Sequence, residues 1–326
     1  MLYIDLVKIL DSHTDLVESL VLSRKHGVLM SAGRDGKLLL WDTVGLACKP
    51  FFSWAPYNGI ELYHSDVSND LRFVLCCFSQ YKEAMVYDRT LQHKFCVPLL
   101  EHCQLPCFAS DNNSIVSHNN KIVYRIDLCN HGGIKRIFKV DSNINFFHWF
   151  KKRDCILLST TKGYVYIIDS QVGSPRAILP KYYRKIAFIC TAIDDSFIVI
   201  GDRKERQIDI WKIDNSSDKT DIELICVHSL NQHWLDDTKK FQKFNDGFIC
   251  FINYDHAFVS GVTHPLCYID FANQVSESLD RIGYCDSIVI DNHNNIIYAP
   301  LLSSDAKPEH LGELGQLGVY SYKIKP

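Results

Sequence analysis

The sequence predicts an all-β protein, built from seven repeats of a small antiparallel sheet over 326 residues. Three observations support this prediction. Short apolar runs alternate with turns rich in Asn, Asp and Gly, residue pairs typical of a strand end recur at intervals, and the last predicted strand can pair with the first. Nothing of comparable length shows sustained helical periodicity.

The first repeat has the most specific spacing. Between residues 13 and 42 it contains an apolar strand, a polar turn, a second strand, a tight turn with two glycines and a third strand. This stretch resembles a WD repeat, because the family's four marker positions are occupied by His13, Ser31, Asp35 and Trp41. The resemblance implies a β-propeller blade held by a hydrogen-bonded tetrad, in which imidazole, hydroxyl and indole groups serve a buried carboxylate. It implies no reaction.

Further residue pairs match the end of that third strand, Trp41-Asp42. They are Tyr87-Asp88, Ile126-Asp127, Ile168-Asp169, Trp211-Lys212, Ile269-Asp270 and Tyr322-Lys323. The first intervals scatter about the ~40 to 45 residues of a propeller blade, and the last two are longer. A polar turn and a short apolar run precede each pair, as a second strand requires. We therefore predict seven blades, of which only the first keeps the complete tetrad.

The two ends of the chain are expected to meet in one sheet. Residues 318–324 are predicted to be the third strand of blade seven, and residues 2–10 supply its outer strand, which removes an exposed edge. The prediction is a seven-bladed, WD-repeat-like β-propeller forming one domain over residues 1–326. The excess residues, 213–245 and 303–317, are expected to be surface insertions.

Composition and charge narrow the class of protein. The chain is 47% hydrophobic and 22% charged with a net charge of -3, which is typical of a folded protein without wholesale attraction to nucleic acid or anionic membranes. Thirteen cysteines, an odd number without a CxxC pair, favour a reducing compartment. The first ten residues lack the features of a signal peptide, and no apolar run is long enough to span a membrane. We expect a cytoplasmic or nuclear protein, or both.

No catalytic motif is present, so we expect no enzyme activity and no cofactor. The densest group of metal-ligand types is irregularly spaced, and a tetrahedral zinc site favours paired steps; we therefore predict ordinary thiols and no metal. The group consists of His93, Cys96, His102, Cys103 and Cys107.

A basic sector is predicted where loops of blades four and five would open on one face. Its residues are Lys162, Lys181, Tyr182, Tyr183, Arg184, Lys185, Arg203, Lys204 and Arg206. Cations beside tyrosines can hold a phosphorylated or acidic peptide, or a nucleic-acid backbone with stacked bases. The alternative is a solvated rim of ion pairs with nearby carboxylates.

A second candidate surface contains Leu311, Leu314 and Leu317, which recur every three residues between glycines. This loop either becomes ordered on a partner or packs on blade seven.

The function predicted from these features is a non-catalytic protein–protein interaction scaffold, a subunit of a multiprotein complex. A propeller holds many loops in fixed positions, which keeps the ordering cost of binding low. The alternative is a nucleic-acid-binding accessory subunit of an RNA- or DNA-processing complex, using the basic face of blades four and five.

Overall fold

The structure is a computed structural model of the whole chain. It describes residues 2–45, 47, 49–56, 60–78, 83–99, 104–129, 133–150, 154–179, 186–191, 196–202, 207–214, 221–229, 247–261, 264–273, 275–279, 288–291, 293–300 and 316–324. Contacts divide the chain into two compact units. One comprises Met1–Ser65, Cys76–Tyr81 and Lys239–Pro326, and the other comprises Asp66–Leu75 and Lys82–Thr238.

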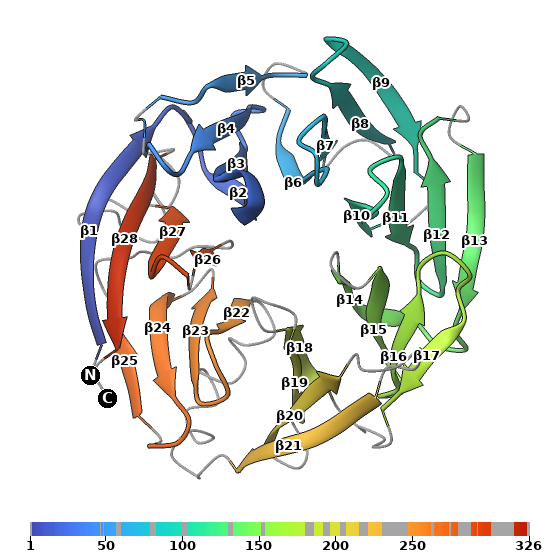
Figure 1. The fold of residues 1–326 in the computed structure, drawn as a ribbon, viewed down its shortest axis with the longest axis vertical. Helices are drawn as coiled ribbons and strands as arrows, with labels where there is room; N and C mark the ends of the chain where they lie inside the picture. Colours follow the sequence, from blue (N-terminus) through green and yellow to red (C-terminus); the bar gives the residue numbers. More distant parts are fainter. Residues whose placement is uncertain are drawn as a thin grey trace. The chain divides into compact units, whose positions relative to one another are not determined.

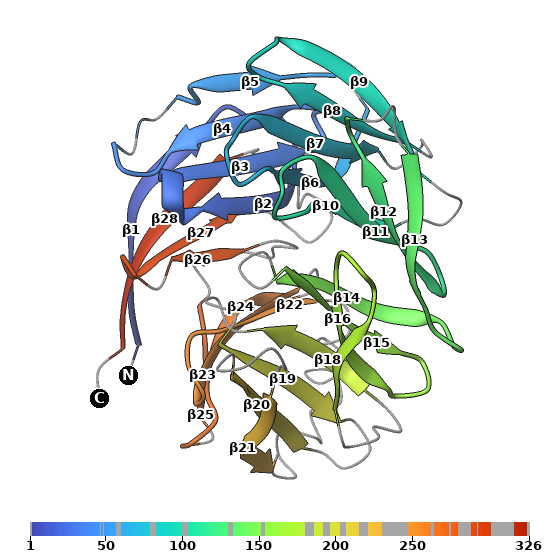
Figure 2. The same ribbon diagram turned by 45° about the vertical axis from the view of Figure 1, so that its right-hand side comes forward.

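In the described part of the chain, the regular structure consists of seven four-stranded antiparallel sheets and one short 3₁₀ turn, η1 (Arg24–His26), which makes the fold a seven-bladed β-propeller (Figures 1 and 2). The first four blades are β2 (Val17–Ser23), β3 (Val28–Gly33), β4 (Leu38–Asp42), β5 (Phe52–Trp54); β6 (Leu62–Val67), β7 (Phe73–Phe78), β8 (Glu83–Asp88), β9 (His93–Pro98); β10 (Gln104–Phe108), β11 (Ser114–His118), β12 (Ile122–Asp127), β13 (Gly133–Lys139); and β14 (Ile144–Phe150), β15 (Cys155–Thr160), β16 (Val165–Asp169), β17 (Pro175–Ile178).

The last three blades follow the same order, with one exception. They are β18 (Ile186–Thr191), β19 (Phe197–Asp202), β20 (Gln207–Asp214), β21 (Asp221–Ser229); β22 (Gly247–Phe251), β23 (His256–Gly261), β24 (His264–Asp270), β25 (Val275–Ser278); and β26 (Val289–Asp291), β27 (Ile296–Pro300), β28 (Gln316–Ile324) with β1 (Leu2–Asp11). Every predicted third-strand ending falls in the third strand of a blade, so the predicted all-β propeller with seven blades is confirmed.

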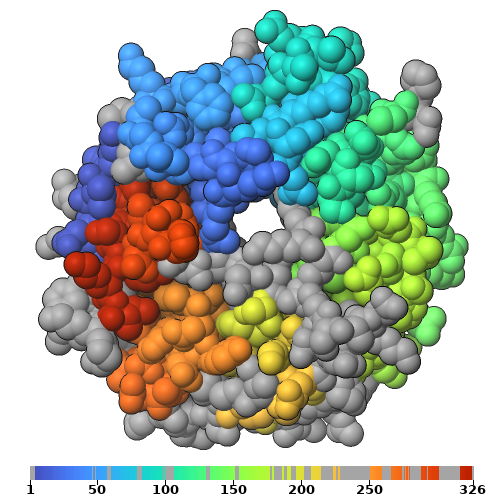
Figure 3. All heavy atoms as spheres, in the orientation of Figure 1, coloured from blue at the N-terminus to red at the C-terminus, as the bar shows by residue number. Residues whose placement is uncertain are grey.

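Blade seven is completed by the first strand of the chain. β1 pairs antiparallel with β28, from Leu2 opposite Ile324 to Asp11 opposite Gln316, with an irregularity between Leu6 and Lys8. The N-terminal and C-terminal strands lie side by side in the ribbon and on the surface (Figures 1 and 3). The predicted closure of the last blade by the N-terminal strand is therefore confirmed.

The recurring aspartate at the end of the third strand shapes the next turn. Its carboxylate accepts a hydrogen bond from a backbone N–H two or three residues later, at 2.9 Å for Asp42 and Val44, and at 2.8 Å for Asp127 and Cys129. Asp88, Asp169 and Asp270 do the same. An aspartate that bonds its own backbone in this way favours a turn over further strand, which explains why the pattern marks strand ends.

The described core lies between neighbouring blades rather than within them. In the first unit, one cluster joins blades one and seven, around Leu10, Trp41 and Tyr298. In the second unit, one cluster joins blades three and four, and another joins blades four and five. Blade four belongs to both clusters of the second unit and so buries both faces of its sheet, which is why its second strand, β15, is buried along its whole length.

Parts of the predicted surface insertion 213–245 are strands of blade five. Ile213 is buried in β20, and β21 forms the outer strand of blade five from Asp221 to Ser229. These residues belong to the sheet because the run pairs with β20 along its whole length. Residues 215–220, 230–246 and 301–315 lie outside the described part of the chain. The assignment of one domain to residues 1–326 stays a prediction.

Two buried tyrosines, which contact the same phenylalanine, provide a matched test of this core. The rings of Tyr268 and Tyr322 lie 5.7 and 5.6 Å from that of Phe258, measured between centroids. The hydroxyl group of Tyr268 makes a 2.7 Å hydrogen bond with His256 Nδ1, whereas that of Tyr322 is buried without a hydrogen-bond partner among the described residues.

We expect Tyr268→Phe to lower the free energy of unfolding by about 1 kcal/mol, and Tyr322→Phe to change it by less than about 0.5 kcal/mol.

Burial raises the pKa of both tyrosines to about 12. Unfolded tyrosine ionises near pH ~10, so their contribution to stability should be intact below that pH and lost as pH rises towards 12. Denaturant unfolding and absorbance at the tyrosinate band measure both effects. Equal losses of unfolding free energy in the two variants would show that the hydrogen bond between Tyr268 and His256 does not stabilise the fold.

Candidate functional site

The four residues of the predicted tetrad form a continuous chain of hydrogen bonds in blade one. Trp41 Nε1 donates to Ser31 Oγ at 2.8 Å, and Ser31 Oγ lies 2.7 Å from His13 Nε2. His13 Nδ1 lies 3.0 and 3.1 Å from the two oxygens of Asp35. With the proton on Nδ1, each group donates to the next, from the indole through the hydroxyl and imidazole to the carboxylate.

The turn between β3 and β4 positions the carboxylate of this tetrad. Asp35 also accepts hydrogen bonds from the backbone N–H groups of Thr14 and Lys37. Burial would raise the pKa of Asp35, but the bonds from His13, Thr14 and Lys37 outweigh it and hold the pKa below its usual range. A Cβ at Gly33 would lie 2.9 Å from both the Asp35 and the His13 side chains, so only glycine leaves room for this pair.

The tetrad contains a serine, a histidine and an aspartate in the order of a hydrolase triad, yet it has no route to a substrate. Ser31 is fully buried, and its oxygen already accepts the indole N–H of Trp41. A nucleophile needs an open side from which the reacting carbon can approach. The arrangement is therefore a structural one that ties the turns of blade one together.

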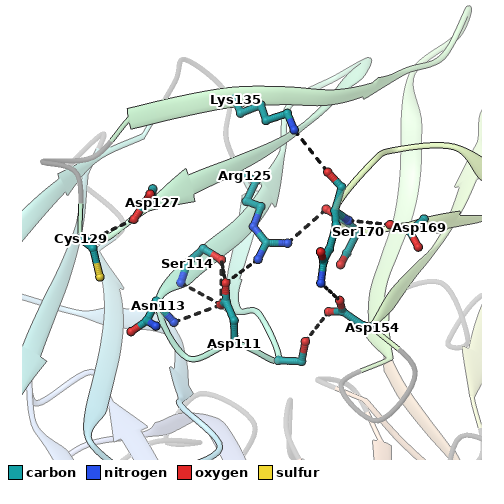
Figure 4. A network of polar contacts seen from close by, with 12 residues as sticks. Asp111, Asn113, Ser114, Arg125, Asp127, Cys129, Lys135, Asp154, Asp169 and Ser170 are labelled. Atoms are coloured by element: carbon teal, nitrogen blue, oxygen red, sulfur yellow. Dashed lines mark hydrogen bonds and ion pairs between the residues drawn. The ribbon is translucent and has the colours of Figure 1, made fainter.

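A second polar network joins the turns of blades three and four, and sequence reasoning did not find it (Figure 4). Arg125 in β12 donates to Asp111 Oδ2 at 2.5 Å and to the backbone oxygen of Ser170 at 3.4 Å. Lys135 Nζ lies 3.5 Å from the backbone oxygen of Gln171. Two cationic side chains of blade three thus donate hydrogen bonds to backbone carbonyl groups in the turn between β16 and β17.

Asp154 makes the reciprocal link in this network. Its carboxylate accepts a hydrogen bond from Ser110 and another from Gln171 Nε2 at 2.8 Å. Burial opposes ionisation of Asp111, but hydrogen bonds from Ser114 and Asn113 and the charge of Arg125 lower its pKa. Because these carboxylates already hold protein donors, the network acts as a staple between two blades rather than as an ion site.

Most of the predicted basic sector lies outside the described residues, namely Lys181, Tyr182, Tyr183, Arg184, Lys185, Arg203, Lys204 and Arg206. Lys162 is described: it is exposed in the tight turn between β15 and β16, as predicted for blade four. The convergence of the sector stays a prediction.

The predicted leucine surface is only partly described. Leu317 is fully buried in β28, where it packs into the core between blades one and seven. It is therefore part of the blade and unavailable to a partner. Leu311 and Leu314 lie outside the described residues.

The cysteine-rich stretch shows no metal geometry in the part of the chain that the structure describes. His93 and Cys96 lie in β9, Cys107 lies in β10, and His102 and Cys103 are outside the described residues. Within the described ranges no group of three or more His, Cys, Asp and Glu side chains converges on a metal position. The nine described cysteines are free thiols.

Comparison with known proteins identifies the fold and goes no further. No protein-family model matches the chain, and no curated protein matches its sequence. The crystal structure of the β-propeller domain of Cps50 (Swd1) from Myceliophteria thermophila is similar, with a TM-score of 0.70 over 98% of this chain and 99% of that one, at 13% identity. In all, 1797 chains of solved structures match, so the fold alone assigns no activity. No helix in the described residues has the length and apolarity of a membrane crossing.

Proposed function

We propose that the chain is a divergent WD-repeat propeller that acts as a non-catalytic interaction subunit of a multiprotein complex. The observation that carries the proposal is a set of blade turns, each held by a hydrogen bond from its backbone to the aspartate at the strand end, that present aliphatic side chains to solvent. Val44, Leu91 and Val172 stand in the turn between the third and outer strands of three different blades and are 84%, 68% and 72% exposed. Side chains on turns fixed in this way lose little conformational freedom when a partner binds, so they are suited to contact with other proteins.

The tetrad of blade one supports the assignment to the WD-repeat class. The proposed location is the cytoplasm, the nucleus or both, because the described cysteines are free thiols, including buried Cys76 and Cys77. Free, buried thiols suit a reducing compartment.

Purification of the tagged full-length chain from its own cells, with and without nuclease, tests the proposal. We expect one or a few proteins in stoichiometric amounts, unaffected by nuclease and retained at about 0.3 M salt, where surface charge pairs are largely screened. Recovery of the chain alone would overturn the proposal. Recovery only with nuclease-sensitive material would instead support a nucleic-acid-binding subunit.

A further inference from the structure

An aromatic patch lies on the edge of blades three and four in the second unit. We define it by four residues: Phe138 in β13, Tyr164 immediately before β16, Tyr166 in β16 and Ile178 in β17. The rings of Phe138 and Tyr166 meet edge to face with centroids 5.8 Å apart, and those of Tyr164 and Tyr166 are 6.2 Å apart. Ile178 is the direct cross-strand partner of Tyr166.

The patch is exposed where a partner could use it. Tyr164 is 43% exposed and Ile178 is 53% exposed, whereas Phe138 and Tyr166 are half-buried and pack against the core between blades three and four. Ring contacts to a buried cluster hold the exposed groups in fixed positions. Tyrosine is over-represented among the residues that dominate binding energies, since it offers a large contact area with few rotatable bonds.

Three lysines belong to the same edge. Lys139 follows Phe138 in β13 and is the cross-strand partner of Ile122, next to Lys121. Lys162 lies two residues before Tyr164 in the turn between β15 and β16. All three side chains are exposed. Burial raises the pKa of Tyr166, with smaller contributions from Tyr164 and from the charge of Asp141, which lies near the aromatic patch.

Backbone hydrogen bonds join the segments that carry these lysines. Val140 N donates to Lys121 O at 3.0 Å, and Ile144 N donates to Asn120 O at 2.6 Å. Thr161 N donates to Asn143 O at 2.8 Å, which ties the turn that carries Lys162 to the segment between β13 and β14. The lysines and the aromatic patch therefore form one pre-organised surface spanning two blades.

We infer that this surface binds an acidic linear segment of a partner protein, with an aromatic or aliphatic side chain seated on the patch and Asp or Glu residues facing Lys121, Lys139 and Lys162. The inference rests on the proposed function and specifies its partner chemistry. The three exposed lysines bring positive charge to one surface of a chain whose net charge is -3. Complementary charge selects an acidic partner and speeds its association.

A protein segment fits this surface better than a nucleic acid does. A polyanion needs a longer track of cations, and a protein of net negative charge attracts it weakly at a distance. The exposed aliphatic side chain of Ile178 beside the tyrosines suits an apolar anchor rather than a stack of bases.

The experiment uses the complex recovered with the full-length chain. A carbodiimide, which joins a lysine amine directly to a carboxylate without a spacer, is added before peptide mapping by mass spectrometry. We expect Lys121, Lys139 or Lys162 to be coupled to Asp or Glu residues within one segment of one partner. Recovery of that partner should fall about tenfold with Lys121→Glu/Lys139→Glu/Lys162→Glu and about fivefold with Tyr164→Ala.

The matched control reverses three exposed lysines elsewhere, as Lys25→Glu/Lys94→Glu/Lys323→Glu, which changes the net charge equally. It should leave recovery within about twofold, and every variant should melt within about 3 °C of the parent chain. Coupling spread evenly over both sets of lysines, or partners that persist in the first variant, would overturn the inference and leave the scaffold proposal standing. Loss of a nuclease-sensitive polymer in place of a protein would also overturn it. Recovery of no stoichiometric protein would overturn both.

Discussion

Gly173→Ala should be among the most damaging single substitutions in the chain, lowering the free energy of unfolding by about 4 kcal/mol or more. Gly173 lies in the turn between β16 and β17 with a φ of +73°. A Cβ built there would lie 1.7 Å from the backbone oxygen of Ile137 and 2.6 Å from its carbonyl carbon. Ile137 cannot retreat, because it lies in β13 and packs into the core between blades three and four.

Gly27→Ala is the control for this prediction, because it has the same backbone strain without the backbone clash. Gly27 has a φ of +61°, and its added Cβ would meet the Cγ2 atom of Val44 at 2.7 Å. Val44 is exposed and can rotate away. We expect a loss of about 1 kcal/mol from the left-handed conformation. Denaturant unfolding of the two variants separates the effects, and equal losses would contradict the proposed close approach of the turn to β13.

Ser31→Ala is expected to lower the free energy of unfolding by about 2 to 4 kcal/mol, the second large effect. The substitution removes the one hydroxyl group that is hydrogen-bonded to both Trp41 Nε1 and His13 Nε2. Both nitrogens are buried, so each would be left without a partner where water cannot replace the lost bond. The loss should therefore exceed that of an ordinary buried serine.

Ser65→Ala provides the comparison in the same unit. Ser65 is equally buried, but its hydroxyl makes one bond, to Ser19 Oγ at 2.9 Å. We expect this variant to lose about 1 kcal/mol. The measurement is chemical unfolding of both variants followed by tryptophan fluorescence and circular dichroism. A Ser31 variant no less stable than the Ser65 variant would show that the tetrad contributes little to the fold.

Much of the fold could be predicted from the sequence because its signals are local. An aspartate that accepts a hydrogen bond from its own turn, as Asp88 and Asp169 do, occurs at the same position in five of the seven blades. The errors come from places where that local chemistry is weak. β21 follows a polar stretch that looks like an insertion, and β28 begins two residues before the predicted strand, which places Leu317 in the core.

The candidate surfaces were harder to predict because packing between blades creates them. Arg125, in a strand of blade three, meets Ser170 only when a turn of blade four packs beside it. Phe138 and Tyr166 stand on different sheets, and the register of β13 shifts beside Phe138. No spacing in the chain indicates these contacts. The position of Lys162 could be predicted because its turn has a fixed place in a blade. The tyrosines beside it have a sequence pattern like that of any other strand.

The pairing of β1 with β28 has a consequence for synthesis of the chain. β1 is made before every other strand that the structure describes and β28 after all of them, so β1 has no partner until the other blades have been synthesised. During that interval Leu6, Val7 and Ile9, which remain partly exposed even in the finished fold, belong to an unpaired strand. We therefore expect blade seven to be completed late in folding, and β1 to be the segment that a nascent-chain chaperone would have to shield.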